Sequence, residues 1–219
     1  MASNHKELKQ YNNIHSKEVG LDEAGRGCLF GPVCVSGVIW PKEEPDNPMT
    51  IKDSKKCTEK YREKLFKYIK KNAIAYSIVL IDNEEIDKNN ILQCSIEGMH
   101  QCLNEITQGE TIDMILVDGD HFKNYYCSTT DEFIKHQCII KGDNTYKSIA
   151  AASILAKTFR DNYIKQLVKE NPGLSMFNIE KNKGYGTKQH MEAIEEYGIT
   201  KWHRKSFSPC KQAKESFLN

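Results

Sequence analysis

The order of apolar and polar residues along the chain predicts four strands. Residues 19–21 and 33–40 are rich in Val and Ile, and the glycine-bearing segment 25–31 separates them, which indicates two strands joined across a loop. Residues 73–81 and the compact apolar run 112–117 indicate two further strands.

Apolar residues at helical spacing predict helices between and after these strands. The segments 92–106 and 148–169 each carry one continuous apolar stripe, and a shorter stripe covers residues 61–69. A last helix is expected over residues 187–197, because Thr187 is a suitable N-cap and Gly198 tolerates the left-handed turn that ends a helix. The first helix is marked by Tyr61, Leu65, Tyr68 and Ile69, the second by Leu92, Ile96, Met99, Leu103 and Ile106, and the third by Ile149, Ala152, Leu155, Phe159 and Leu167.

This alternation predicts an α/β layer structure, because each apolar helix stripe needs a sheet face to bury against. A chain of 219 residues fits one catalytic domain, expected over residues 18–219. Residues 1–17 are polar and lack an apolar period, so they are expected to form a flexible arm, with a short helix as the alternative.

Composition narrows the class of protein. Lys and Arg number 31 against 30 Asp and Glu, so bulk charge does not indicate a nucleic-acid partner and any such site must rest on local patches. The eight cysteines are scattered, no two are separated by two residues, and no secretory leader precedes them, which predicts reduced thiols in an intracellular protein. The longest apolar stretches are shorter than the about 20 residues that a membrane span needs, so a soluble, cytoplasmic protein without a membrane partner is expected.

Three acids stand at predicted strand ends. Asp22 and Glu23 follow a β-branched run, and Asp118 ends another, so they can converge at one edge of a sheet. Hard divalent cations such as magnesium prefer such oxygen ligands. Neighbours on a regular strand point to opposite faces, so Asp22 and Glu23 can share a site only if the backbone turns there, which the following glycines permit. From these residues alone, solvated turn or cap residues remain an alternative.

Seven blocks in the sequence resemble ribonuclease HII, the type 2 ribonuclease H family, in order from residue 18 to about residue 209. The opening block is the string GLDEAGRG at residues 20–27, followed by GPV at 31–33. The resemblance implies a ribonuclease H-like fold, in which helices flank a mixed central sheet and a small helical portion lies at the C-terminus. The other six blocks are KDSKK (52–56), NILQ (90–93), VDG (117–119), KGD (141–143), SIAAASILAK (148–157) and GYGT (184–187), with HRKSF (203–207) near the end.

The resemblance also implies an activity and a set of catalytic carboxylates that bind Mg²⁺ or Mn²⁺. Two metals roughly 4 Å apart would activate water for in-line attack on phosphorus. The enzyme would hydrolyse the RNA strand of RNA–DNA hybrids and cut 5′ of ribonucleotides embedded in duplex DNA, leaving 3′-hydroxyl and 5′-phosphate ends. A role in ribonucleotide excision during DNA replication and repair follows from that substrate. The implied carboxylates are Asp22, Glu23, Asp118 and Asp143.

Nucleic-acid contacts are implied at three further places. The loop residues Gly25, Arg26 and Gly27 resemble those that contact the ribonucleotide, and Tyr185 resembles the ring that stacks on the following deoxyribose. Backbone groups of a glycine loop can approach the 2′-hydroxyl, which alone distinguishes the ribose. Without the motif, Tyr185 would be interpreted as a half-buried aromatic residue. The implied phosphate contacts are Lys55, Lys56 and Lys157, each of which could instead be a solvated surface lysine.

Three positions near the motifs qualify this assignment. Cys28 stands where the family often has Pro, and Asp120 where it often has Asn, which predicts a less rigid loop and a more acidic site. We expect Asp120 to face solvent. Asp161 lies four residues after Lys157 on the expected helix, so an ion pair explains it and it stays outside the catalytic set.

Rival interpretations come from other classes of protein. A type 3 ribonuclease H, acting only on long hybrids, typically has Lys where Arg26 stands and a sizeable domain before the motif. An inactive hybrid-binding module would be free to lose carboxylates. A sliding-clamp-binding tail at residues 212–217 has its apolar pattern interrupted by Lys214 and Glu215. We expect a monomer without an obligate protein partner.

Overall fold

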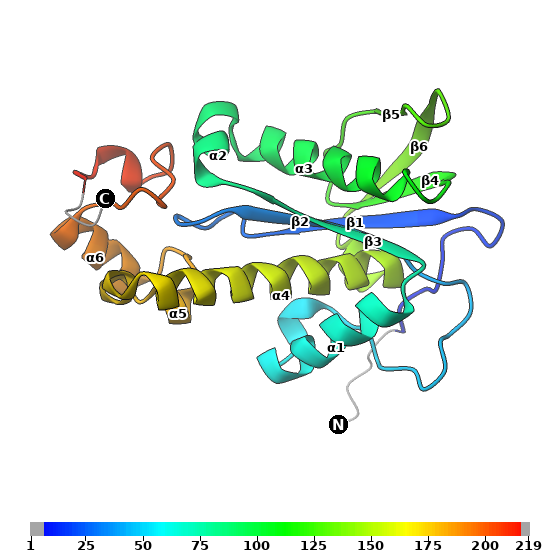
Figure 1. The fold of residues 1–219 in the computed structure, drawn as a ribbon, viewed down its shortest axis with the longest axis horizontal. Coiled ribbons are helices and arrows are strands. Elements are labelled where there is room, and N and C mark those ends of the chain that lie inside the picture. The colour runs from blue at the N-terminus through cyan, green and yellow to red at the C-terminus, as the bar shows by residue number, and fades with distance from the viewer. Residues whose placement is uncertain (1–6, 216–219) are drawn as a thin grey trace.

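The computed structural model describes residues 7–215, whose strands pair into one six-stranded sheet (Figure 1). The strand order is β3-β2-β1-β4-β6-β5. The predicted mixed sheet is confirmed, because β1 pairs antiparallel with β2 but parallel with β4, which in turn is parallel to β6. Strands β1, β4 and β6 therefore end at the same edge. The bounds are β1 Glu18–Ala24, β2 Val33–Ile39, β3 Ala75–Ile81, β4 Met114–Asp118, β5 Tyr125–Cys127 and β6 Glu132–Ile139.

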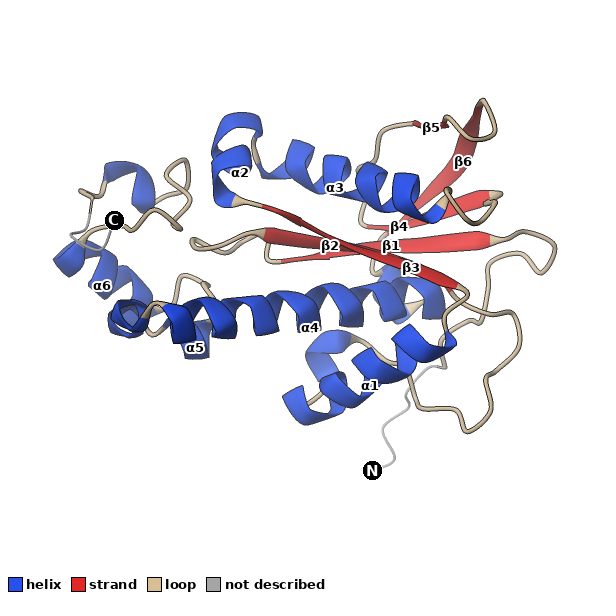
Figure 2. Ribbon diagram, viewed as in Figure 1, coloured by secondary structure: helices blue, strands red, loops and turns tan. Residues whose placement is uncertain are grey.

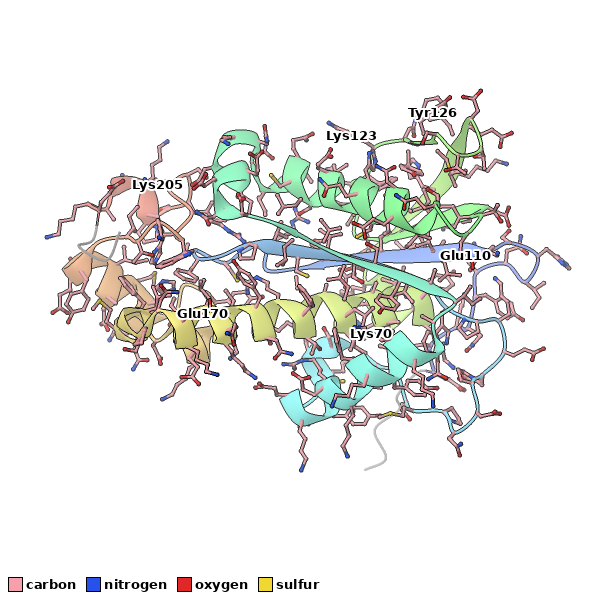
Figure 3. All side chains as sticks on the ribbon, viewed as in Figure 1. Lys70, Glu110, Lys123, Tyr126, Glu170 and Lys205 are labelled. Atoms are coloured by element: carbon pink, nitrogen blue, oxygen red, sulfur yellow. The ribbon has the colours of Figure 1, made fainter. Side chains whose placement is uncertain are left out.

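Helices cover both faces of this sheet, as Figure 2 shows. Helix α3 (Ile91–Ile106) lies on one face, whereas α4 (Lys147–Glu170) and α1 (Glu59–Asn72) lie on the other. Side chains of β2 alternate between the two faces of the sheet. Val35 therefore joins the core under α3, and Val38 joins the core shared with α1 and α4. Charged residues such as Lys70 and Glu170 are exposed on the helices (Figure 3).

The predicted helix ends follow from capping. The Thr187 hydroxyl accepts a hydrogen bond from the backbone of His190 and begins α6 (Lys188–Tyr197), and Gly198, with φ of 81°, ends it. The Thr58 hydroxyl caps α1 in the same way. Both predicted ends of α6 are therefore confirmed.

A small C-terminal portion packs beyond the end of the sheet. It contains α5 (Ile179–Asn182), α6 and short 3₁₀ turns, and in Figure 1 it lies near the end of α4. Its apolar core includes Phe177 and Ile194 and also Phe30 from the loop between β1 and β2. The portion therefore buttresses the glycine-bearing loop.

Several elements differ from the predicted ones. Strands β5 and β6 and helix α2 (Asn83–Asn89) were not predicted. Strand β5 has three residues and α2 has seven, so neither is long enough for a clear period, and the side chains of β6 are mostly exposed or half-buried without clean alternation. Residues 7–17 form no helix, and Lys9 bridges to Tyr146 through backbone hydrogen bonds. Within residues 7–215, no helix is long and apolar enough to span a membrane.

Candidate active site

Three of the four proposed carboxylates come together where β1 and β4 end. Asp22 and Asp118 each lie one position beyond the paired residues Leu21 and Val117, so they are neighbours on adjacent parallel strands. Asp143 lies in the 3₁₀ turn Gly142–Asn144, just before α4. The Gly142 N–H donates to Asp118 Oδ1 at 2.6 Å and ties this turn to the strand.

These acids repel one another in a buried setting. Burial raises the pKa of Asp22 well above its usual range, and the charges of Glu23 and Asp118 raise it further. Burial also raises the pKa of Asp118, with a further contribution from the charge of Asp143. The Ser153 hydroxyl on α4 and the backbone N–H of Glu23 partly offset the shift at Asp22.

Glu23 lies near the cluster although the backbone does not turn between it and Asp22. Strand β1 continues through Ala24, and Asp22 and Glu23 pair with Ser36 and Val35 on β2, so the turn that the following glycines would permit does not form at these two residues. Alternation therefore directs the two side chains to opposite faces at the strand end. Burial raises the pKa of Glu23, Arg26 at 3.2 Å lowers it, and the charge of Asp118 raises it, so Glu23 remains within electrostatic reach of that acid.

The donor chemistry of the cluster suits a hard divalent cation. Among residues 7–215, no three His, Cys, Asp or Glu side chains form a preassembled metal cluster. Carboxylate oxygens are nevertheless the ligands that Mg²⁺ and Mn²⁺ prefer, and a cation would offset both the burial and the mutual repulsion that raise the pKa values of these acids. Asp22, Glu23, Asp118 and Asp143 therefore fit such an ion by their chemistry.

The KDSKK segment brings two of the proposed lysines to the acids. The pKa values of Glu23 and Asp118 are raised chiefly by burial, and the positive charge of Lys55 partly offsets both shifts. The Lys56 ammonium donates to Asn144 Oδ1 at 2.9 Å, and the Asn144 amide donates to Asp143 Oδ1 at 3.0 Å. Sequence reasoning assigned Asn144 no role, although its place beside Asp143 in the motif was the available signal.

Two buried arginines shape the glycine-bearing loop. Arg160 on α4 donates to the carbonyl oxygens of Phe30, Pro32 and Lys183 at 2.8 to 2.9 Å. Arg204 donates to the carbonyl oxygens of Arg26 and Gly31. Both side chains are fully buried, and in the described part of the chain neither forms a salt bridge with a carboxylate.

Close packing against Arg160 also explains Gly25. This residue has φ of 94°, and a Cβ atom there would lie 2.1 Å from Arg160 Nε. The sequence pointed to Arg204 only as part of the HRKSF segment and did not point to Arg160, because the acceptors of both lie far away along the chain. Their carbonyl contacts identify both as residues that build the loop.

Tyr185 lies directly beside that loop. It forms an isolated antiparallel bridge with Cys28, and the residue is 41% exposed. The Lys157 ammonium lies 5.5 Å from the ring centroid and also pairs with Asp161 at 2.7 Å. The predicted Lys157–Asp161 ion pair is thus confirmed, and Arg62 extends it at 3.3 Å.

The remaining predicted features are also placed by the structure. All eight cysteines are free thiols, which confirms that part of the prediction, and Cys28 is buried against the Lys183 carbonyl. Asp120 is exposed and hydrogen-bonds to His121, as expected for a solvent-facing acid. The postulated clamp-binding tail lies partly outside the described residues, which end at Glu215.

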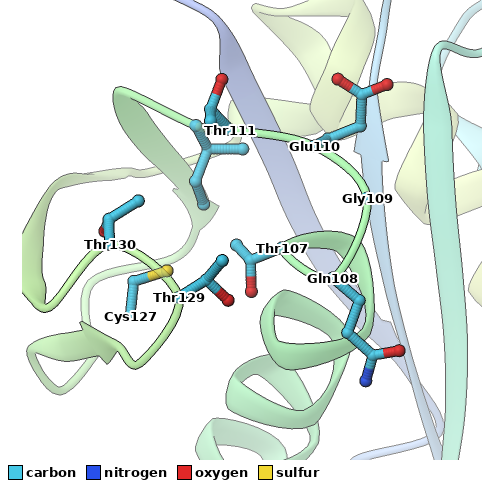
Figure 4. A pocket seen from close by; sticks show the side chains of 9 residues that line it. Thr107, Gln108, Gly109, Glu110, Thr111, Cys127, Thr129 and Thr130 are labelled. Carbon is cyan, nitrogen blue, oxygen red and sulfur yellow. The ribbon is translucent and has the colours of Figure 1, made fainter.

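Two pockets lie apart from the acid cluster. The smaller, of about 190 Å³, is lined by residues that include Thr107, Thr111 and Cys127 (Figure 4). Because Ile112 lines it and precedes β4, it lies at the opposite end of that strand from Asp118. A wider groove of about 610 Å³ runs between α2, α3 and Lys123.

Comparison with known proteins settles the family. The model of the family described as ribonuclease HII matches residues 19–210. The chain belongs to the ribonuclease HII family. The ribonuclease HII of Christiangramia forsetii is 47% identical over 91% of this chain and 94% of its own. The ribonuclease HII of Bacteroides thetaiotaomicron is 43% identical over 92% of this chain and 94% of its own. The prediction of a type 2 ribonuclease H enzyme is thereby confirmed.

Solved structures agree with the ribonuclease HII assignment. The ribonuclease H2 of Pyrococcus horikoshii superposes with a TM-score of 0.71 over 89% of this chain and 95% of its own, at 23% identity, and therefore shows the fold. The ribonuclease HII of Archaeoglobus fulgidus, solved in complex with PCNA, has a TM-score of 0.68 over 90% of this chain and 98% of its own, at 27% identity. A Bst ribonuclease HIII solved with Mn²⁺ has a TM-score of 0.61 over 95% of this chain and 70% of its own, at 18% identity. The predicted ribonuclease H-like α/β fold is confirmed.

Proposed function

We propose that this ribonuclease H hydrolyses the RNA strand of RNA–DNA hybrids and cuts 5′ of ribonucleotides embedded in duplex DNA, leaving 3′-hydroxyl and 5′-phosphate ends. The observation that carries the proposal is the position of the acid cluster at the end of β1, immediately before the loop that Arg160 and Arg204 shape. Chemistry and sugar recognition then act on adjacent atoms of one substrate strand.

The acids of the chain would hold Mg²⁺ or Mn²⁺. Asp22, Glu23, Asp118 and Asp143 supply the oxygen ligands, and the family is divalent-metal dependent. When bound, the cations would activate a water for in-line attack and neutralise charge on the phosphate, as two-metal catalysis requires. The Mn²⁺ complex of the ribonuclease HIII neighbour supports the choice of ion.

The loop and its neighbours would select the substrate. The Arg160 and Arg204 hydrogen bonds turn loop carbonyls inward, so the backbone N–H groups of residues 25–27 are available to the ribose or its phosphate. Tyr185 would stack on the deoxyribose that follows. Lys55, Lys56 and Lys157 would contact phosphates, with salt-sensitive affinity.

Cleavage of labelled duplex DNA containing one ribonucleotide tests this proposal. The assay runs with Mg²⁺ and with Mn²⁺, beside an all-DNA duplex and a long RNA–DNA hybrid. We expect cutting 5′ of the lone ribonucleotide, with ends that a polymerase can extend. Cutting of the long hybrid alone would favour type 3-like specificity, and binding without any cutting would favour an inactive hybrid-binding module.

A further inference from the structure

Two histidines are buried together beneath Tyr185. His190 lies on α6 and His203 on the segment that follows it, both are fully buried, and their Nε2 atoms lie 3.1 Å apart. The rings of Phe30 and Phe177 pack edge-on against His203, with centroids 5.1 and 5.0 Å away. Two nitrogens at this distance require one proton between them, because two lone pairs or two protons would repel.

The backbone fixes which nitrogen carries each proton. The Thr200 N–H donates to His203 Nδ1 at 3.0 Å, so that nitrogen accepts and the His203 proton lies on Nε2. His203 Nε2 then donates to His190 Nε2, which leaves the His190 proton on Nδ1. That proton is directed at the Tyr185 carbonyl oxygen, 2.9 Å away. The two imidazoles thus form a directed relay from Thr200 to Tyr185.

The relay ends on a peptide group whose side chain is exposed. The Tyr185 N–H donates to the Asn182 carbonyl, and the Tyr185 carbonyl also accepts from the Thr187 N–H at 2.8 Å. The backbone is therefore held on both sides while the ring remains partly open to solvent. Burial lowers the pKa values of both histidines, which keeps the pair neutral, as the relay requires.

We infer that His190 is a positioning residue that orients Tyr185 toward the sugar following the ribonucleotide, and that His203 holds the His190 proton on Nδ1. Neither touches the substrate, and the inference rests on the proposed function of Tyr185. A core that needed only volume would place apolar side chains here, because each buried imidazole brings nitrogens that must find partners.

Two substitutions at His190 separate positioning from packing. The amide nitrogen of Asn takes the place of Nδ1, so His190→Asn keeps the donor to Tyr185 and loses the link to His203. The longer Gln side chain places its amide near Nε2, so His190→Gln keeps that link and loses the donor. The quantity measured is the ratio of cleavage rates on a single embedded ribonucleotide and on a long hybrid, which is independent of the amount of folded enzyme.

We expect His190→Gln to lower this ratio about five-fold, the scale of one lost hydrogen bond, and His190→Asn to keep it within about two-fold. In the Tyr185→Ala background, His190→Gln should change the ratio no further, because both variants remove the same interaction. An unchanged ratio in His190→Gln, or equal losses in both backgrounds, would overturn the positioning role while leaving the proposed function intact. A wild-type enzyme that does not cut the embedded ribonucleotide would overturn both.

A spectroscopic measurement tests the relay without any variant. Long-range ¹H–¹⁵N correlation spectra distinguish the two neutral tautomers of each histidine. We expect His203 protonated on Nε2 and His190 on Nδ1, and the opposite tautomers would contradict the relay.

Discussion

Two groups of buried like charges contrast in this protein: the acids at the end of β1 and β4, and the arginines that hold the loop after β1. Burial raises the pKa values of Asp22, Glu23 and Asp118, and neighbouring carboxylates raise them further. The guanidinium groups of Arg160 and Arg204 are buried more completely, yet backbone carbonyls accept five hydrogen bonds from them. Every guanidinium nitrogen of Arg160 donates to a backbone carbonyl, and Nε and Nη1 of Arg204 do the same, whereas Arg204 Nη2 is buried without a partner among the described residues. Backbone carbonyls thus stabilise the arginines, whereas the buried, mutually repelling acids have the electrostatics that favour a cation.

The comparison predicts that the arginine cluster maintains the fold. Arg160→Met should lower the free energy of unfolding by about 3–5 kcal/mol, because three buried carbonyls lose their donor. Urea denaturation measures the loss, and Lys169→Met, an exposed lysine on the same helix, serves as a control that should stay within about 0.5 kcal/mol. A loss at Arg160 no larger than that of the control would mean that the loop does not depend on this side chain.

The acid cluster should behave in the opposite way, by governing activity instead of folding. Asp22→Asn should fold and bind substrate but cut at least about 100-fold more slowly, since it removes a group that acts on transition-state charge. Single-turnover cleavage measures this, with the exposed Asp120→Asn as a control expected to retain its rate. Undiminished cleavage would remove Asp22 from the mechanism.

A smaller and more selective effect is expected at Tyr185, which lies beside the loop that the arginines hold. Tyr185→Ala should lose about ten-fold more activity on a single embedded ribonucleotide than on a long hybrid, the scale of one aromatic stacking contact. Tyr163→Ala, a similarly exposed tyrosine on α4, should lose neither activity. If Tyr185→Ala lost both activities equally, Tyr185 would be assigned to folding.

The smallest predicted effect is on stability as a function of pH. Because the pKa of native Asp22 is raised, its proton is held more tightly than in the unfolded chain, and stability is lost as pH rises through the native pKa. Asn does not titrate, so Asp22→Asn does not lose stability in this way. In the presence of a metal chelator, its free energy of unfolding should therefore exceed that of the wild type by about 1 kcal/mol or more near pH 8, with little difference near pH 4. Chemical denaturation at the two pH values checks the sign, and a gap that widened on acidification would contradict the assigned shift.

The periodic and motif-bearing parts of the molecule were predictable from the sequence. Helices α1 and α3 have apolar stripes that need no tertiary information, and Thr187 and Gly198 act through neighbouring backbone groups. Helix α4 was predicted in place, but residues 148–156 are buried on all sides and Phe159, expected in its stripe, is exposed. Asp118 ends β4 as predicted. The family blocks nominated all four acids, and adjacent parallel strands bring two of them together.

Only the tertiary structure decided how the loop, Tyr185 and the acids are held. The path of β1 through Glu23 depends on pairing with β2, and the exposed strand β6 lacks the alternation that would reveal it. Arg204 donates to loop carbonyls that lie more than 170 residues away in the sequence. His203 hydrogen-bonds to His190, which in turn hydrogen-bonds to the Tyr185 carbonyl. Local patterns record which side chains are apolar, but a hydrogen bond between distant segments is specified only once the chain has folded and both partners are buried.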